Sequence, residues 1–407
     1  MLDYNKIKKE LQAYKIKEPL IAALYGHRIL ATQIIHRDFL VLEFLNIFYS
    51  HLKMNFNEES VKFIKKPNLV EILFDSDSEK LKEIFENRYK DKFENFNTFL
   101  FVINSLKKFQ IGLDSVKSEG KFLYPYSFNM LFHNDSSRRN NFTRSGELLY
   151  LMVKRSKYFE EFKKLLVEKF SYSKWDKIIS LLDDEYFSKE EKLGYLPYKE
   201  HFVYDLLVKN LIKVLNLDIP KRDIFYYFNI VMSFFMSFYI LSVARGDFYF
   251  VVEILNKKSD NVRRKSRETY RMNEEAIIQS IDIYIQKYKI DKKDIKIKNL
   301  IEAHRTYLRG ILSSRENTNA YRYSISDDFL KTLVLLNVKD KMNVEKFLDI
   351  IYQEYRIIIS EKHSKMVFEL SSYSDFRKNE QRLIKRLKML GFIEEKSDGD
   401  IYIKVSK

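Results

Sequence analysis

The sequence predicts a mainly α-helical protein with a small α+β module at its C-terminal end. Among 407 residues, glycine (9) and proline (5) are scarce, and a sheet-rich fold needs many turns that favour these residues. Apolar residues recur with helical spacing over most of the chain, whereas short alternating stretches occur near the end. A hydrophobic content of 45% excludes a disordered chain.

The first half of the chain carries the helical pattern most clearly. Apolar residues at i, i+3 and i+4 run through residues 20–52, 78–109 and 146–170. We therefore expect a multi-helix N-terminal domain over residues 1–215, and a helical middle region over residues 216–320.

The middle region contains an uncharged stretch of 21 residues, 224–244. Its length fits a membrane span. However, Asn229, Ser233 and Ser237 lie at i, i+4 and i+8, so they form one polar stripe on a helix. A core helix buried on all sides has the same composition. We expect a buried core helix and no contact with a membrane; a membrane span is the alternative.

Residues 376–405 predict a helix that ends at a glycine, followed by a strand, a turn and a second strand. Gly391 lies where a glycine commonly ends a helix, and Asp398 and Gly399 are a hairpin-turn signal. The preceding segment, 364–378, fits either a helix or a strand at its start. The apolar positions are Leu383, Leu387 and Leu390 in the helix, and Ile401, Ile403 and Val405 in the second strand.

A helix followed at once by a β-hairpin resembles the end of a winged-helix domain. The resemblance covers residues 327–407 at most, and 376–405 closely, within a module that we place at 321–407. In that family the last helix enters the DNA major groove and the hairpin forms the wing. The features are generic to a very large superfamily, so they imply the fold more firmly than the target.

The charge of the predicted last helix fits this resemblance. Residues 376–388 include six basic residues and one acid, Glu380. Cations suit phosphates, and Arg and Gln side chains can reach base edges. A solvated helix in a module that contacts only protein is the alternative. The residues predicted to point away from the leucines are Lys378, Gln381, Arg382 and Lys385.

The whole chain is basic, with 72 Lys and Arg against 57 Asp and Glu, a net charge of +15. Such a charge attracts polyanions, so duplex DNA is the expected partner, with an acidic protein as the alternative. The chain has no cysteine, which excludes a disulfide framework, a thiolate zinc site and a cysteine nucleophile. The first residues lack a secretory apolar segment, so a cytoplasmic location is expected.

A polar loop, 133–150, is the strongest candidate for an active site. His133, Asp135 and Glu147 suggest a metal-dependent nuclease. A metal site needs more ligands at one point, and no metal, nucleotide-binding or hydrolase motif occurs. We therefore expect no metal and no cofactor. We prefer phosphate or nucleic-acid binding by the arginines beside a helix N-terminus, with a structural loop as the next alternative and catalysis after it. The arginines are Arg138, Arg139 and Arg144.

Two further arginine clusters extend the expected DNA footprint. One lies in a charged segment, 256–275, and the other follows His304, which we expect to be a packed or surface histidine. A solvated linker is the alternative for the first cluster. The candidate phosphate contacts are Arg263, Arg264, Arg267, Arg305 and Arg309.

The sequence thus predicts a non-catalytic DNA-binding accessory or scaffold subunit. Its layout is loosely similar to helical accessory subunits of bacterial DNA-processing or genome-defence (antiviral) assemblies, in which a partner supplies the ATPase or nuclease. The alternatives are a metal-dependent nuclease centred on the 133–147 loop, and a scaffold whose winged helix does not bind DNA.

Overall fold

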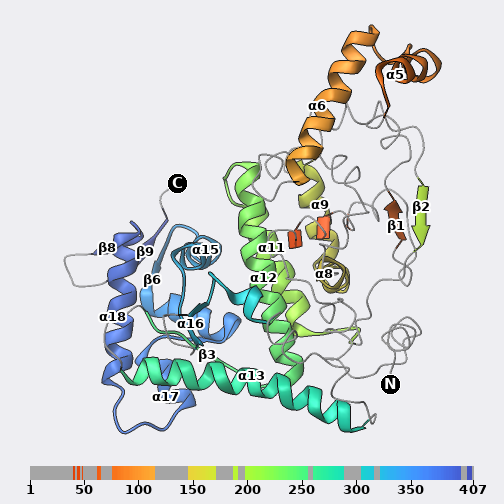
Figure 1. Ribbon diagram of the computed structural model, residues 1–407. Coiled ribbons are helices and arrows are strands. Elements are labelled where there is room, and N and C mark those ends of the chain that lie inside the picture. Colours follow the sequence, from red (N-terminus) through yellow and green to blue (C-terminus); the bar gives the residue numbers. More distant parts are fainter. Residues whose placement is uncertain are drawn as a thin grey trace.

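The protein is mainly helical, with short strands concentrated in its C-terminal half, as the sequence predicts (Figure 1). The computed structural model describes residues 40–41, 44–45, 48, 62–65, 76–114, 145–170, 187–190, 198–254, 260–287, 304–315, 321–395 and 401–405.

The described elements before the centre of the chain are mostly helices. They are β1 (Lys62–Lys65), α5 (Ser78–Ile84), the π-helix η2 (Phe85–Tyr89), α6 (Phe96–Asp114), α8 (Ser145–Lys154), α9 (Phe159–Phe170), β2 (Phe187–Glu190) and α11 (Phe202–Leu215). Strands β1 and β2 pair in antiparallel orientation. Helices α5, η2 and α6 project from the body (Figure 1) and enclose a small core of their own, which includes Phe85, Tyr89 and Phe99.

Helix α12 (Lys221–Arg245) runs through the middle of the molecule (Figure 1). Every residue from 230 to 242 is buried. Phe234 packs against Phe250 and Phe329, at ring-centroid distances of 5.6 and 5.0 Å. Within the described residues, this is the one helix long and apolar enough for a membrane span, and 78% of its most apolar window is buried inside the protein. Core helices of soluble proteins share this signature.

The polar stripe predicted on this helix faces other parts of the chain. Ser233 and Ser237 are fully buried. Ser237 Oγ lies 2.7 Å from Nδ1 of His304, which is also fully buried. His304 is therefore a packed core residue.

The second half begins with β3 (Phe250–Val251) and the long helix α13 (Asn261–Lys287), followed by the antiparallel pair β4 (Ser313–Arg315) and β5 (Tyr321–Tyr323). The remaining elements are α15 (Asp327–Asn337), β6 (Lys341–Asn343), α16 (Val344–Tyr355), β7 (Ile357–Ile358), α17 (Glu361–Val367), α18 (Ser374–Met389), β8 (Ile393–Glu395) and β9 (Ile401–Lys404).

The C-terminal strands form an antiparallel three-stranded sheet in the order β6-β9-β8. The predicted helix and hairpin are present as α18, β8 and β9, and Gly391 has the left-handed φ of 80° expected after a helix end. Asp398 and Gly399 lie outside the described residues. Residues 364–378, whose start fitted either a helix or a strand, begin within α17, which ends at Val367. They contain no strand before α18 begins.

One cluster of buried apolar residues extends from Leu40 to Ile403. The predicted limit near residue 215 coincides with the break between α11 and α12, and residue 320 lies outside the described residues. The buried core continues across both positions. The C-terminal elements are also tied to the body by the parallel pairing of β3 with β7.

Candidate nucleic-acid interface

Helix α18 is amphipathic, and its burial pattern matches the predicted leucine stripe. Phe376, Asn379, Leu383 and Leu387 are buried. Asn379 is fully buried, and its side-chain amide bonds the backbone of three residues: it accepts from Ile254 N and donates to the carbonyl oxygens of Val252 and Ile359. These bonds fix one face of α18 against the body of the protein.

The opposite face of α18 is open to solvent. Lys378, Gln381 and Lys385 are all exposed, and the side chain of Lys378 is 62% exposed despite its ion pair with Asp375 at 3.6 Å. Lys385 has no ion-pair partner among the residues that the structure describes. Three of the four residues predicted to face DNA therefore present their polar ends to solvent.

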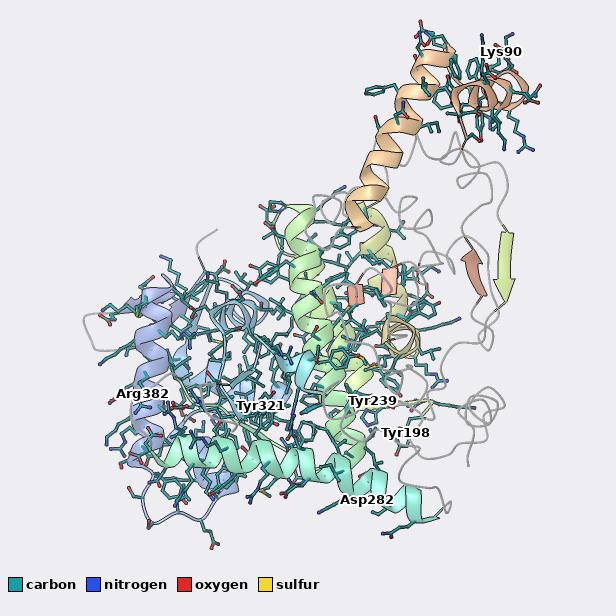
Figure 2. The ribbon with its side chains drawn as sticks, in the orientation of Figure 1. Lys90, Tyr198, Tyr239, Asp282, Tyr321 and Arg382 are labelled. Atoms are coloured by element: carbon teal, nitrogen blue, oxygen red, sulfur yellow. The ribbon has the colours of Figure 1, made fainter. Side chains whose placement is uncertain are left out.

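Arg382, the fourth residue, lies at the edge of this face, where the middle of α18 approaches the N-terminal end of α13 (Figure 2). Its Nη2 donates to Asp260 Oδ2 at 3.0 Å, and its side chain is 24% exposed. Asp260 also caps α13, because its Oδ1 accepts a hydrogen bond from Arg263 N at 2.9 Å. A nearby carboxylate, Asp375 Oδ2, accepts from Asn261 N.

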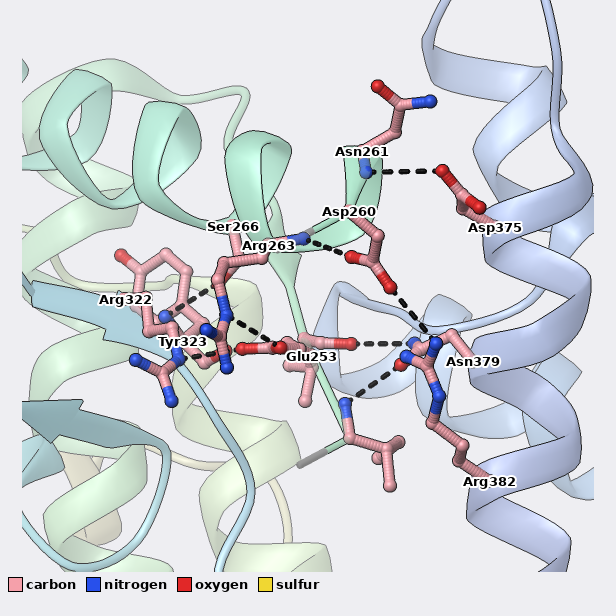
Figure 3. A network of polar contacts seen from close by, with 12 residues as sticks. Glu253, Asp260, Asn261, Arg263, Ser266, Arg322, Tyr323, Asp375, Asn379 and Arg382 are labelled. Carbon is pink, nitrogen blue, oxygen red and sulfur yellow. Dashed lines mark hydrogen bonds and ion pairs between the residues drawn. The ribbon is translucent and has the colours of Figure 1, made fainter. Parts of the chain in front are cut away.

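A buried ionic cluster continues inward from this contact (Figure 3). Glu253 is fully buried and lies between two guanidinium groups, 2.9 Å from Arg263 Nε and 2.7 Å from Arg322 Nε. Arg322 is also fully buried. Buried charges need such partners because they have lost their hydration. Arg263, a predicted phosphate contact, is thus one member of an internal ionic cluster.

The other predicted arginines occupy different environments. Arg305 makes a bidentate pair with Glu274, at 2.6 and 3.0 Å, and its guanidinium lies 4.5 Å from the centre of the Tyr321 ring. Arg264 is 62% exposed and lies 3.8 Å from Glu268. Arg267 is half-buried and Arg309 is exposed. Among the described residues, Arg264 and Arg305 form their ion pairs with acidic residues of α13 and not with residues of α18.

A shallow depression of about 600 Å³ separates α17 from α18. Its lining includes three cationic side chains, Lys362, Lys365 and Arg377, and two carboxylates, Glu361 and Glu380. Hydrogen bonds from Arg377 and Lys365 lower the pKa of Glu361 to about 2. The depression therefore holds one more cation than carboxylates, and Glu361 pairs with two of its cations.

The loop that holds the nuclease alternative lies outside the described residues, including His133, Asp135, Arg138, Arg139 and Arg144. Glu147 belongs to α8, but its side chain is outside them too. Among the described residues, no group of three or more His, Asp or Glu side chains is placed to hold a metal ion.

Sequence reasoning missed a chain of three polar side chains beside α17. Ser360 Oγ lies 2.7 Å from His363 Nδ1, and His363 Nε2 lies 2.9 Å from Asp349 Oδ1. These residue types build catalytic triads, but Ser360 is only 2% exposed and caps α17. The trio therefore helps to position α17, and its serine and histidine are buried from solvent. The spacing of Ser360 and His363 at a helix start was the signal available in the sequence.

No family model matches this chain, and no curated protein or solved structure matches it significantly.

Proposed function

We propose that this chain binds duplex DNA through the outward face of α18, as a non-catalytic accessory or scaffold subunit. The observation that carries the proposal is the exposure of Lys378, Gln381 and Lys385 on the side opposite the buried leucines. Lysines on such a face neutralise phosphates, and a glutamine amide can pair with the edge of adenine. A role in a bacterial DNA-processing or genome-defence assembly remains a prediction from the sequence.

The arrangement around α18 supports a winged-helix interpretation of the C-terminal module. Helix α17 precedes α18 after a short connection, residues 368–373, and α18 leads directly into the β8–β9 hairpin. Strand β6 pairs with β9 and completes the sheet. In this interpretation α18 is the helix that enters the major groove, and the hairpin is the wing.

The proposed footprint is narrower than the sequence alone suggests. Arg263 and Arg305 already pair with the carboxylates of Glu253 and Glu274, so a phosphate would have to compete with an internal partner at both positions. Lys378 and Lys385 face no such competition from a distant part of the described chain. We therefore centre the footprint on α18.

Replacing Lys378 and Lys385 together by glutamine tests the proposal. The double variant keeps two polar, helix-compatible side chains but removes two charges. We expect several-fold weaker binding to a short, fluorescently labelled duplex of mixed sequence. A plot of log K against log[salt] should become shallower by about 1.8, since each lost phosphate contact contributes about 0.9. Fluorescence anisotropy over a salt series gives both quantities.

A second double variant, Lys157→Gln with Lys164→Gln, is the matched control. It removes the same charge from two exposed lysines, one just before α9 and one within it, and α9 lies across α12 from α18 (Figure 1). Equal losses of affinity in the two double variants would show attraction by net charge alone and would contradict a site on α18.

One observation favours the alternative that the module contacts protein. Met366 and Met389 are 66% and 87% exposed at the C-terminal ends of α17 and α18, and exposed methionines are common on surfaces that bind other proteins. Unchanged DNA affinity in the Lys378→Gln, Lys385→Gln variant would favour this alternative.

A further inference from the structure

The contact between Arg382 and Asp260 occupies the border of the proposed DNA-binding face. Arg382 follows Gln381 directly, and Lys378 and Lys385 lie one helical turn to either side of it. Its guanidinium turns toward α13 and meets Asp260 there (Figure 3). A carboxylate and a phosphate are both oxyanions that bind guanidinium groups, so the contact with Asp260 is of the kind that Arg382 could make with a phosphate.

This contact uses only part of the hydrogen-bonding capacity of Arg382. Arg382 donates one hydrogen bond to Asp260, from Nη2 to Oδ2 at 3.0 Å. The other terminal nitrogen, Nη1, is buried and has no hydrogen-bond partner among the described residues. A guanidinium binds a phosphate best with two parallel N–H bonds. Nη1 thus has no acceptor while Arg382 contacts Asp260, and a DNA phosphate could accept from it only after the guanidinium has left Asp260.

Asp260, whose side chain is 11% exposed, has a second source of stabilisation besides Arg382. Its second oxygen caps α13 through Arg263 N, and it lies at the positive end of the helix dipole. The neighbouring pair of Glu253 and Arg322 is different, because both side chains are fully buried. Opening that pair would leave a buried charge without a partner. Among the ion pairs of Figure 3, the one between Arg382 and Asp260 is therefore the one suited to exchange.

We propose that Asp260 is an internal substitute for a DNA phosphate, which holds Arg382 in the free protein and yields it when duplex DNA binds. This inference rests on the proposed function and adds a regulatory contact to the same site. In the free protein Asp260 competes with DNA for Arg382, which weakens binding. In the complex Arg382 joins Lys378 and Lys385 on the phosphates, and α18 loses one contact with the end of α13.

The variants Asp260→Asn and Arg382→Gln, alone and combined, test the exchange. Asparagine is as good a helix cap as aspartate, so Asp260→Asn removes the competing charge and keeps the start of α13. We expect it to tighten binding to the labelled mixed-sequence duplex several-fold, with an unchanged salt slope because Arg382 reaches a phosphate in both proteins. We expect Arg382→Gln to make the slope shallower by about 0.9 in both backgrounds, and to cancel the gain from Asp260→Asn.

Asp77→Asn is the matched control. Asp77 caps α5, one of the helices that project from the body, by accepting a hydrogen bond from Lys80 N at 2.9 Å. It removes the same charge at an equivalent position remote from α18. Circular dichroism melting of each variant confirms that the fold is retained. An equal gain in Asp77→Asn, or a gain that persists in the Arg382→Gln background, would overturn the exchange. So would an Arg382→Gln variant with unaltered affinity and slope, because Arg382 would then never meet DNA.

The two proposals fail in different ways. If Lys378 and Lys385 prove necessary for binding and Asp260→Asn has no effect, α18 binds DNA and the exchange is wrong. If neither the wild-type protein nor Asp260→Asn binds the duplex, both proposals are wrong. Binding that occurs only in Asp260→Asn, and is lost again with Arg382→Gln, would support the exchange in its strongest form.

Discussion

At the scale of single residues, the pair of Ser237 and His304 shows how polar side chains are accommodated in the core. Both side chains are fully buried and 2.7 Å apart. The other ring nitrogen of His304, Nε2, has no hydrogen-bond partner among the described residues. Burial, reinforced by the positive charge of Arg305, lowers the pKa of His304 to about 3. The folded protein therefore holds this imidazole neutral.

This histidine makes stability depend on pH. Its pKa is lower in the folded than in the unfolded state, so its contribution is complete above the unfolded value, about 6.5, and declines as the pH falls below it. From about pH 7.5 to about pH 5.5 the free energy of unfolding should fall by about 1.4 kcal/mol on account of His304. Urea titrations at both values measure the loss, and His304→Gln should reduce it by that amount. An undiminished pH dependence in the variant would contradict this assignment.

The arginines of the C-terminal half show that the sequence locates positive charges but does not reveal which of them pair with acidic side chains inside the protein. Arg322, fully buried against Glu253, was not a candidate, whereas Arg263 and Arg305 were. Glu253 lies ten positions before Arg263, and Glu274 lies 31 positions before Arg305. No pattern in the sequence marks either acid as the partner of these arginines, and Arg322 joins Glu253 from a distant segment. Lys378 and Lys385 were predictable because the leucine stripe of their own helix fixes the direction of the outward face.

At the scale of secondary-structure elements, the end of α18 directs the chain into the β8–β9 hairpin. Gly391 has a φ of 80°, and its amide donates to Lys388 O at 3.0 Å, while Phe392 N donates to Leu387 O at 2.9 Å. A Cβ at Gly391 would meet no atom within 4 Å. The glycine is needed for the left-handed backbone and not for space.

Gly391→Ala should therefore destabilise the protein by about 1 kcal/mol, the strain of an L-residue in the left-handed region. Without a steric clash, the loss should not be larger, and DNA binding by α18 should survive below the melting temperature. Chemical denaturation and the duplex anisotropy assay measure the two effects. Gly391→Asn is a useful companion, since asparagine tolerates this conformation better than alanine. Equal losses from both substitutions would argue against backbone strain as the cause.

Local signals explain which elements the sequence predicted. Helix α18 and the hairpin follow from the leucine spacing, Gly391 and the alternation after it, all within a short segment. The strand β7 carries no such signal, because its two residues pair with β3 about a hundred positions away. Asn379 lies between charged neighbours on a helix, and its burial became visible only with its three backbone partners in place.

At the scale of the whole molecule, the C-terminal module shares its core with the rest of the protein. Phe329 and Tyr355 from the module pack on Phe234 of α12, with ring centroids 5.0 and 5.8 Å away. Strand β7 pairs with β3, and Asn379 bonds the backbone beyond it. The pattern of apolar and polar residues changes near residue 320, but this pattern does not reveal which apolar faces pack together. The interface with α12 depends on contacts between residues far apart in the chain.

An isolated fragment of residues 321–407 should therefore fail to fold on its own. Without α12 and β3 it would expose the apolar faces of α15 and α16, and large exposed apolar patches favour association over a single folded monomer. We expect poorly dispersed amide resonances and no cooperative melting.

In the full-length protein, hydrogen exchange gives the same test without truncation. The amides of β9 and of α12 should be exposed by one shared unfolding event, with equal free energies of opening. A fragment that melts cooperatively, or β9 amides that open well before those of α12, would show instead that the module is an independent domain, and the contact between Arg382 and Asp260 would then join two separately folding units.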